Sequence, residues 1–360
     1  MDIAIIGAGI AGLSAGWALR HAGHRVRMFE RNYKPGGRMN TRRKAGLVVD
    51  HGDRFIYRDS PVLRELITDC GLQGEVATID LPIYTMREDG SFQESAEEGI
   101  DRNRITFPDG MLVLPEALRR QLGGYYSIGV TAVERNENAK RFVVQTEPPL
   151  RPVESHVDAV VIAVPATEAV HISRPIHNLL NPVFLEKARE VEYTRCLTLM
   201  AALPKVELPQ PFYGLTPPKT PTTTLSWVAF EDLKCARRGV HGWSIMIAHS
   251  TSEAGAKYLS MEDENALGKM YQEARRYVPQ LPSEWRWARA KRWRVAHLQD
   301  PTKVVLSKEY PAAPEPVLVE FCGDYREGDG CESAARSGRL AAESLQAKIE
   351  KLLGGKPTTS

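Results

Sequence analysis

Apolar positions at the start of the chain change their spacing twice within thirty residues. Residues 2–6 form a short apolar run, which predicts a buried parallel strand. From Leu13 to His21 the apolar positions recur at helical spacing, and this segment ends near Gly23. Residues 24–30 predict a second strand with an acidic residue, Glu30, at its end. The pattern therefore predicts a strand, helix and strand unit.

A GxGxxG sequence, Gly7-Ala8-Gly9-Ile10-Ala11-Gly12, lies between the first strand and the helix. In a dinucleotide-binding turn, Gly7 allows the tight bend, Gly9 lets the backbone approach a pyrophosphate, and Gly12 lets helix and strand pack closely. The helix N-terminus adds free N–H groups and partial positive charge. An ordinary glycine turn is the alternative, and the order of the surrounding elements disfavours it. The expected contacts to a dinucleotide are Gly7, Gly9, Ile10, Ala11 and Gly12.

Two features after the second strand indicate which nucleotide is bound. Glu30 lies eighteen residues after Gly12, where a carboxylate can accept hydrogen bonds from a ribose hydroxyl and would repel the 2′-phosphate of NADP. Gly36-Gly37-Arg38 follows, with two glycines that admit a close ligand and a guanidinium suited to phosphate. The alternative for Arg38 is a solvated arginine in a basic surface run that includes Arg31, Arg42 and Arg43.

The composition narrows the class of protein. The chain has 360 residues, of which 42% are apolar and 26% charged, with a formal net charge of +2. This length predicts one large or two smaller domains. The near-neutral charge argues against a dedicated nucleic-acid binder, and no apolar run reaches the roughly 20 residues that span a bilayer. We therefore expect no nucleic-acid partner and no transmembrane segment.

The cysteines are odd in number and contain no CxxC pair. They are Cys70, Cys196, Cys235, Cys322 and Cys331. This set argues against a disulfide framework, a zinc site and a CxxC redox centre, so no metal is expected. Free thiols are typical of a reducing compartment, which predicts a cytoplasmic location.

Residues 7–30 together with Gly36-Gly37-Arg38-Met39 resemble the start of the flavin-containing amine oxidase superfamily, whose members bind FAD. Later segments resemble the same family in the same order: Asp50-His51-Gly52, Phe107 to Leu118, residues 129–144, residues 157–165, Gly323-Asp324 and residues 330–338. No cysteine stands in the setting used for covalent flavin attachment, so non-covalent FAD is implied. Beyond the glycine turn, the implied FAD contacts are Glu30, Arg31, Gly37, Arg38, Met39, Gly52, Asp53, Val130, Ala163, Gly323, Asp324, Gly330, Cys331 and Ala334.

The C-terminal motif has a physical basis as well. Asp324 follows the apolar run 317–322, and strand ends in doubly wound folds point at ligands. Its implied partner is the ribityl chain or the pyrophosphate of FAD. A helix from about Cys331 would direct N–H groups at the flavin pyrimidine, where negative charge develops on reduction. This arrangement needs no acid or base from the protein.

The fold class implied is α/β: a Rossmann-type FAD-binding domain with an interleaved smaller α+β substrate domain. Residues 1–77, 104–168 and 290–351 are expected to form the first domain. Residues 78–103 and 169–289 are expected to form the second, and residues 352–360 a flexible tail.

The middle of the chain is similar to one branch of the family, the renalase-like branch. Residues 191–199, 226–228, 247–251 and 291–294 follow one another in the order seen there. Two departures from the wider family bear on the substrate. Asp53-Arg54 replaces the family's Ala-Gln, and the strand 196–203 contains no lysine of the kind that holds a water at flavin N5. Amine oxidation is therefore less expected than oxidation of a reduced nicotinamide dinucleotide isomer.

Three side chains are candidates for the substrate pocket at the domain interface: Trp227, His249 and Trp293. Each has an alternative role in core packing. Trp293 lies in an aromatic-rich segment, and His249 ends an apolar strand where a hydrogen-bonded core histidine is equally expected.

The expected activity is that of an FAD-dependent oxidase, in which a small donor passes a hydride to flavin N5 and O₂ accepts the electrons to give H₂O₂. One alternative is an FAD dehydrogenase or desaturase that passes electrons to a quinone or another carrier. Another is a flavin-binding interaction protein without turnover. The oligomeric state, monomer or dimer, is left open.

Overall fold

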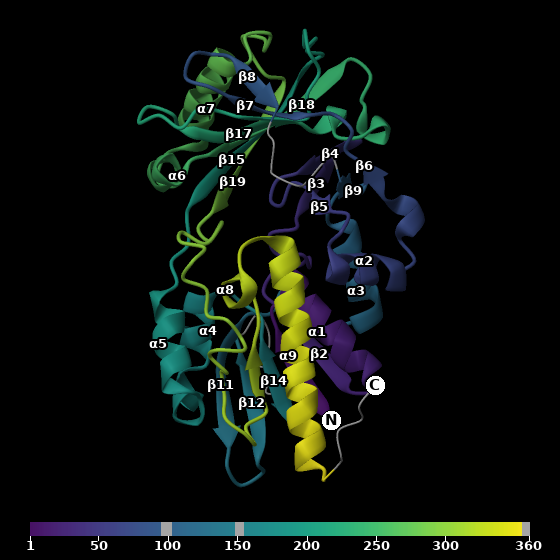
Figure 1. Ribbon diagram of the computed structural model, residues 1–360, viewed down its shortest axis with the longest axis vertical. Coiled ribbons are helices and arrows are strands. Elements are labelled where there is room, and N and C mark those ends of the chain that lie inside the picture. The colour runs from purple at the N-terminus through teal and green to yellow at the C-terminus, as the bar shows by residue number, and fades with distance from the viewer. Residues whose placement is uncertain (95–102, 148–154, 355–360) are drawn as a thin grey trace.

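The computed structural model describes residues 1–94, 103–147 and 155–354 (Figure 1). A parallel sheet covered by helices lies at one end of the elongated molecule, and a larger mixed sheet lies at the other (Figure 1). The α/β fold with a Rossmann-like half, predicted from the sequence, is confirmed. No helix within the described ranges is long and apolar enough to cross a membrane.

The parallel sheet has five strands in the order β10-β2-β1-β14-β20, and every neighbouring pair is parallel. Its central strands are fully buried apolar runs, as parallel strands covered on both faces require. The strands are β1 (Asp2–Ile6), β2 (Arg25–Glu30), β10 (Tyr125–Tyr126), β14 (Ala159–Ile162) and β20 (Val319–Phe321). Segments from both ends and the middle of the chain therefore meet in one sheet.

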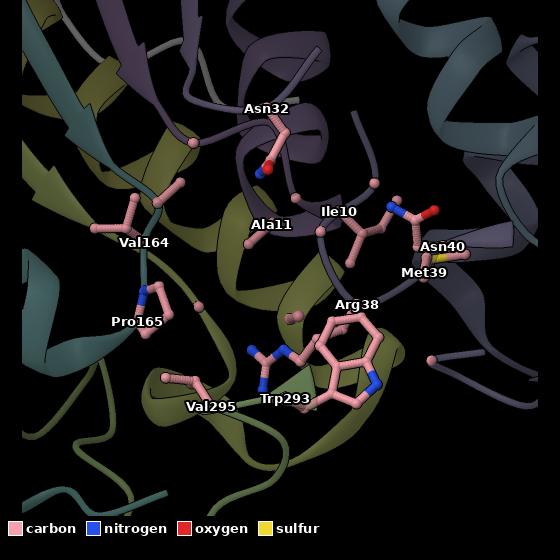
Figure 2. A pocket seen from close by; sticks show the side chains of 18 of the residues that line it. Ile10, Ala11, Asn32, Arg38, Met39, Asn40, Val164, Pro165, Trp293 and Val295 are labelled. Carbon is pink, nitrogen blue, oxygen red and sulfur yellow. The ribbon is translucent and has the colours of Figure 1, made fainter. Parts of the chain in front are cut away.

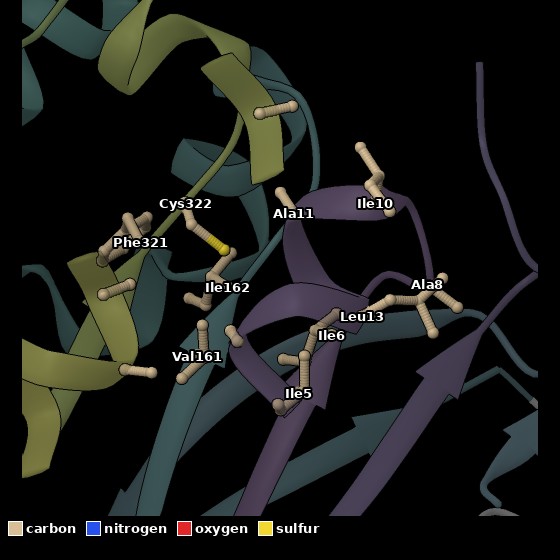
Figure 3. Close-up of a cluster of buried hydrophobic side chains, with 14 of the residues drawn as sticks. Ile5, Ile6, Ala8, Ile10, Ala11, Leu13, Val161, Ile162, Phe321 and Cys322 are labelled. Carbon is tan, nitrogen blue, oxygen red and sulfur yellow. The ribbon is translucent and has the colours of Figure 1, made fainter. Parts of the chain in front are cut away.

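Two helices pack together beside this sheet, α1 (Ile10–His21) and α9 (Gly330–Leu352). They approach at backbone contact distance, because a Cβ at Gly338 would lie 2.0 Å from the carbonyl oxygen of Ala11. Figure 3 shows the core between them and the strands, where Leu13, Val161 and Phe321 belong to one buried cluster. Helix α9 ends at Leu352, and residues 355–360 of the expected tail lie outside the described residues.

A second layer completes this half of the molecule. An antiparallel ribbon contains β11 (Val130–Asn136), β12 (Arg141–Thr146) and β13 (Ser155–Val157). It is followed by α4 (Ala166–Ile172), the 3₁₀ helix η2 (Arg174–Leu179) and α5 (Pro182–Glu190). The apolar residues of these helices lie in the same core as β1 and β14. Residues 169–191 thus pack with the nucleotide-binding half, whereas the sequence-based boundary placed them in the substrate domain.

The mixed sheet has seven strands in the order β19-β15-β18-β17-β16-β7-β8. Only β16 and β7 are parallel neighbours in it. The strands are β7 (Ile83–Met86), β8 (Phe92–Glu94), β15 (Cys196–Pro204), β16 (Gly214–Thr216), β17 (Leu225–Phe230), β18 (Trp243–Ser250) and β19 (Trp287–Trp293). Residues 290–293, expected in the FAD-binding domain, lie in β19 because that strand pairs along its whole length with β15.

The two faces of the mixed sheet have different partners. Leu197, Leu199 and Ala201 of β15 face a cluster formed with α6 (Ser252–Tyr258) and α7 (Asp263–Tyr277). Met200 and Ala202, on the alternate face, pack with residues of the other half. This second face is turned toward the nucleotide-binding half.

Short elements connect the two halves. They are β3 (Thr41–Lys44), β4 (Leu47–Asp50), β5 (Ile56–Tyr57), α2 (Pro61–Asp69), η1 (Gln73–Glu75), β6 (Ala77–Thr78), β9 (Arg104–Thr106), α3 (Val113–Leu122), η3 (Glu231–Leu233), η4 (Ala236–Arg238) and α8 (Asp324–Glu327).

Four charged side chains form a buried ion cluster where β4 meets η3 and η4: Asp50, Glu231, Lys234 and Arg238. Lys234 Nζ lies 2.7 Å from Asp50 Oδ2, and an Arg238 nitrogen lies 2.6 Å from the same oxygen. Burial raises the pKa of Asp50, but the charges of Arg238 and Lys234 lower it by more. The pKa of Asp50 is therefore well below its ordinary value. The backbone N–H of Asp50 also donates to Glu231 at 2.9 Å. The cluster therefore joins the two halves through paired charges that are buried from the surface.

The cluster yields a stability prediction. Lys234→Met removes one buried partner of the Asp50 carboxylate, and we expect the free energy of unfolding to fall by about 3–5 kcal/mol. Lys187→Met is the matched control, because Lys187 pairs with Glu190 at 3.1 Å on the surface, where an ion pair contributes about 0–1 kcal/mol. Urea denaturation measures both. Equal losses in the two variants would contradict the role given to the cluster.

Candidate functional site

A cavity of about 480 Å³ lies at the carboxyl ends of the parallel strands and reaches β18 and β19 of the mixed sheet (Figure 2). Both halves of the molecule contribute to its wall. All but one of the expected FAD contacts line it: Gly7, Gly9, Ile10, Ala11, Glu30, Arg31, Gly37, Arg38, Met39, Gly52, Asp53, Val130, Ala163, Gly323, Asp324, Gly330, Cys331 and Ala334. The exception is Gly12.

The three glycines of the turn differ in what surrounds them. Gly7 has a φ of +104°, and a Cβ there would lie 2.5 Å from the carbonyl oxygen of Ala163. A Cβ at Gly12 would lie 2.0 Å from the carbonyl oxygen of Gly7, so this glycine permits packing of α1 on the turn. A Cβ at Gly9 would meet no atom within 4 Å. Of the three, only Gly9 has open space on the side where a Cβ would lie, which suits the close approach of a pyrophosphate.

The N-terminus of α1 also fits a phosphate. Gly9 is the N-cap residue and offers no side-chain hydrogen bond, and the first turn contains no acidic residue. Ile10 and Ala11 of this turn line the cavity (Figure 2). Helix N-termini with free N–H groups and partial positive charge favour anions.

Glu30 is held at the end of β2 by three hydrogen bonds. Its Oε2 accepts from the N–H of Ala8 at 2.9 Å, and its Oε1 accepts from the backbone and side-chain nitrogens of Asn32 at 2.8 and 2.6 Å. The carboxylate is thereby fixed beside the glycine turn, and Oε2, which accepts a single hydrogen bond, keeps lone-pair capacity for a ribose hydroxyl. Next to it, Arg31 pairs with Glu168 at 3.0 Å.

Arg38 is not a solvated surface residue. Its guanidinium donates to Asp324 Oδ2 at 2.6 Å and to the carbonyl of Ala296 at 3.0 Å. The Tyr193 hydroxyl donates to the other Asp324 oxygen at 3.3 Å. Burial lowers the pKa of Arg38, but Asp324 more than offsets this, and the net pKa is above the ordinary value. Arg38 thus spans the cavity from the Gly-Gly segment to the start of α8 with a permanent charge.

The far end of the cavity is aromatic. Trp293 Nε1 donates to the carbonyl of His51 at 3.2 Å and lies the same distance from Thr198 Oγ1. The His51 and Trp293 rings have centroids 5.6 Å apart. His249, from β18, also lines this end, and its Nε2 has no hydrogen-bond partner among the described residues. Trp293 and His249 therefore lie where a pocket was expected.

Both histidines are neutral near pH 7. Burial lowers the pKa of His51 to about 4, helped by the positive charge of Lys291. Burial likewise lowers the pKa of His249 to about 3, with a contribution from Arg54. Neutral imidazoles offer this end of the cavity hydrogen bonds without charge.

Trp227 does not line the cavity, contrary to expectation. It is paired with His249 in the β17–β18 register, but its side chain is only 2% exposed. The Arg54 guanidinium lies 4.4 Å from the Trp227 ring centroid, and the Tyr213 ring packs edge-on at 5.9 Å. These two side chains cover the indole, which is therefore part of the core between the sheet and the other half.

Sequence reasoning missed several lining residues. His297 and Asp329 form a hydrogen bond of 2.9 Å, and Asn32 and Lys291 also face the cavity. Strand alternation could have identified Lys291 from the sequence, because it lies two residues before Trp293 and therefore on the same face of β19. Among the described residues, no group of three or more His, Cys, Asp or Glu side chains is arranged to hold a metal ion.

The fold and the cavity define a two-part dinucleotide-binding protein, and comparisons with known families narrow the class. Residues 5–70 match the NAD(P)-binding Rossmann-like domain, and residues 88–346 match the flavin-containing amine oxidoreductase family. The second match covers most of the chain, so the chain belongs to the flavin-containing amine oxidoreductase family. FAD is accordingly its cofactor, and the open glycine turn, the uncapped helix and the fixed Glu30 carboxylate fit that molecule.

Curated relatives cover less of the chain. A 4,4′-diapophytoene desaturase (4,4′-diaponeurosporene-forming) from Staphylococcus aureus strain Newman is 30% identical over 149 residues. The counterpart from the bovine strain RF122 / ET3-1 is 41% identical over the same length. Each alignment covers 40% of this chain and 28% of the relative. The chain thus spans under a third of the length of the curated relatives it matches.

Solved structures share the whole fold at low identity. Cyclohexylamine oxidase from Brevibacterium oxydans IH-35A has a TM-score of 0.69 at 14% identity, covering 97% of this chain and 99% of the other. Putrescine oxidase bound to putrescine has a TM-score of 0.68 at 15% identity, with 96% and 99% coverage. A CLA-producing fatty acid isomerase from P. acnes has a TM-score of 0.68 at 13% identity, with 95% and 98% coverage. The fold therefore serves more than one reaction.

The buried neutral His51 yields a pH prediction. The pKa of His51 is near 6.5 in the unfolded chain and about 4 in the folded chain. Neutral His51 therefore contributes its full stability to the fold above pH 6.5, and this contribution is lost as the pH falls toward 4. Between pH 7.5 and 5, we expect the native chain to lose about 1–2 kcal/mol more stability than the His51→Gln variant. Urea denaturation without added FAD, at both pH values, measures this. Parallel pH profiles for the two proteins would contradict it.

Proposed function

We propose that this protein is an FAD-dependent oxidase that takes a hydride from a small donor. Bound FAD would supply the chemistry by accepting the hydride at N5 and passing two electrons to O₂, which gives H₂O₂. The observation that carries the proposal is the single cavity that runs from the glycine turn of the parallel sheet to the aromatic end under the mixed sheet. A cofactor and a donor can meet in such a cavity between two halves.

Each end of the cavity has a proposed task. Gly9 and the N-terminus of α1 would hold the pyrophosphate, and Glu30 would hold the adenosine ribose. Arg38 and Asp324 would orient the middle of the cofactor through their ion pair. The N-terminus of α9, which also has no side-chain cap, would face the flavin pyrimidine and stabilise negative charge there.

The aromatic end would bind the donor. Trp293 is fixed by its two hydrogen bonds, so its ring gives the donor a rigid apolar wall. His249 Nε2, which has no described partner, would hydrogen-bond a polar group of the donor. Neither His51 nor His249 carries charge at neutral pH, so these residues position the donor rather than attract an ion.

The finer identity of the donor is also a proposal. The order of the segments 191–199, 226–228, 247–251 and 291–294 supports the renalase-like branch, and with it a reduced nicotinamide dinucleotide isomer over an amine. A second candidate is a dehydrogenase or desaturase that passes electrons to a quinone or another carrier. The similarity of 149 residues to a desaturase favours that candidate.

Anaerobic mixing tests the function. We expect at least one reduced nicotinamide isomer to bleach the flavin absorbance of the FAD-loaded protein, and benzylamine or putrescine to leave it unchanged. Admitting O₂ should then restore the absorbance and release one H₂O₂ for each donor oxidised. Fast reoxidation by a quinone with slow reoxidation by O₂ would select the dehydrogenase. A flavin that no donor reduces would refute both enzymes.

The two glycines of the turn allow a matched test of the cofactor site. Gly9→Ala adds a methyl group in open space, so we expect stability without FAD to stay within about 0.5 kcal/mol and FAD to bind at least tenfold more weakly. Gly12→Ala places the same group against the Gly7 carbonyl and should cost about 1–3 kcal/mol of stability. Urea denaturation and flavin fluorescence quenching measure the two effects. Native FAD affinity in Gly9→Ala would refute the assignment.

A further inference from the structure

Lys291 lies on the face of β19 that looks into the cavity. Its backbone pairs with Thr198 of β15, and its side chain lines the cavity two residues before Trp293. The Lys291 ammonium lies 4.6 Å from the centroid of the Trp293 ring. This contact with an aromatic face restrains the ammonium beside the residues proposed to bind the donor.

Three other cations of the cavity wall pair with carboxylates, whereas Lys34 and Arg294 line the cavity without an ion pair among the described residues. Arg38 pairs with Asp324 and Arg31 with Glu168. Arg292, next to Lys291 but on the other face of β19, pairs with Asp263. Within the described parts of the chain, the side chain of Lys291 forms no hydrogen bond and no ion pair. Lys291 is therefore a half-buried cation without a protein counter-ion.

The charged groups that shift the pKa of Lys291 have the same sign as its own. Burial lowers the pKa of Lys291, and Arg42 and Arg31 lower it further, with no carboxylate acting in the opposite direction. Asp53 also lines the cavity. Apart from burial, its pKa responds to the charges of Arg38, His297, Asp329 and Arg54 and not to Lys291. No carboxylate of the cavity wall thus balances the positive potential around Lys291.

Such a cation has a direct consequence for the ligand. A partly desolvated positive charge is unfavourable until an anion neutralises it, and it repels a second cation in the same space. Resting on the proposed function, we infer that Lys291 binds an anionic group of the donor, a carboxylate or a phosphate, beside Trp293 and His51. The same charge excludes protonated amines from this end of the cavity.

The phosphates of FAD are a second source of negative charge, and the position of Lys291 argues against them. The uncapped turn at Gly9 and Ile10 belongs to the parallel sheet. Lys291 belongs to the mixed sheet and contacts the ring of Trp293, whose indole is bonded to His51, although the charge of Arg31 beside Glu30 also acts on Lys291. The donor is therefore the partner that fits the location, and the experiment separates the two.

Three probes of similar shape and different charge test the inference: benzoate, phenyl phosphate and benzylammonium. Each is titrated into the FAD-loaded protein, and binding is read from the change in flavin absorbance without any turnover. We expect at least one anion to bind at least tenfold more tightly than benzylammonium. The tighter of the two anions identifies the donor group as a carboxylate or a phosphate.

Variants then assign the effect to Lys291. Lys291→Gln should weaken binding of the preferred anion at least tenfold, whereas Lys291→Arg, which keeps the charge, should weaken it less than threefold. Lys44→Gln is the matched control, because Lys44 also lies over a tryptophan, 5.5 Å from the Trp287 ring, but does not line the cavity. It should leave anion binding unchanged. The Kd for FAD, from fluorescence quenching, should change less than threefold in all three variants.

Several results would overturn the inference. Equal binding of anions and benzylammonium, binding of no probe, or an unaltered anion Kd in Lys291→Gln would each do so. A tenfold weaker FAD complex in Lys291→Gln with normal anion binding would assign the ammonium to the cofactor instead. Because the titrations need no hydride transfer, they remain informative if no donor reduces the flavin and the proposed oxidase activity fails.

Discussion

The cavity exists because two sheets are held at a fixed separation, and the buried ion cluster fixes that separation. Asp50 ends β4, one of the elements that connect the halves, and precedes His51, Gly52 and Asp53, which line the cavity. Lys234 and Arg238 reach the Asp50 carboxylate from the segment after β17. Because paired charges in a dry interior tolerate little displacement, a shift of one half against the other is costly. The cluster therefore positions the aromatic end of the cavity relative to the glycine turn. It does so without contributing a side chain to the site itself.

In the nucleotide-binding half, close backbone contact fixes the positions of two helices beside the cavity. Gly12 packs α1 on its own turn, and Gly338 lets α9 approach α1 at backbone distance. The N-termini of both helices consequently open on the same cavity, that of α1 at the expected place of the pyrophosphate and that of α9 at the expected place of the flavin pyrimidine. Arg38 and Asp324 connect them across the middle. Packing and electrostatics thus converge on one site, whose wall holds both acidic and basic side chains and where the first turn of α1 contains no acidic residue.

Local patterns predicted the features that depend on neighbours in the chain. The glycine turn, Glu30 and the strand end at Asp324 all follow from spacing within a few dozen residues, and all border the cavity except Gly12. Features that depend on tertiary packing were not accessible in the same way. Asp50 and Lys234 are 184 positions apart, so no local pattern pairs them. Trp227 has the expected register beside His249, but the cover provided by Arg54 is visible only in three dimensions. Likewise, the apolar faces of α4 and α5 do not reveal which sheet they cover.

The interleaving of the parallel sheet has a consequence for biosynthesis. Strand β1 emerges from a ribosome well before two other strands of its sheet, because β14 lies some 150 residues later and β20 about 160 residues after β14. Gly323, Asp324, Gly330 and Cys331, which complete the cavity wall, are translated more than 300 residues after the glycine turn. A nascent chain therefore displays an intact glycine turn long before it has a place for the flavin ring. Cofactor capture therefore waits until β20 and the segment after it have joined β1 and β14 in the sheet.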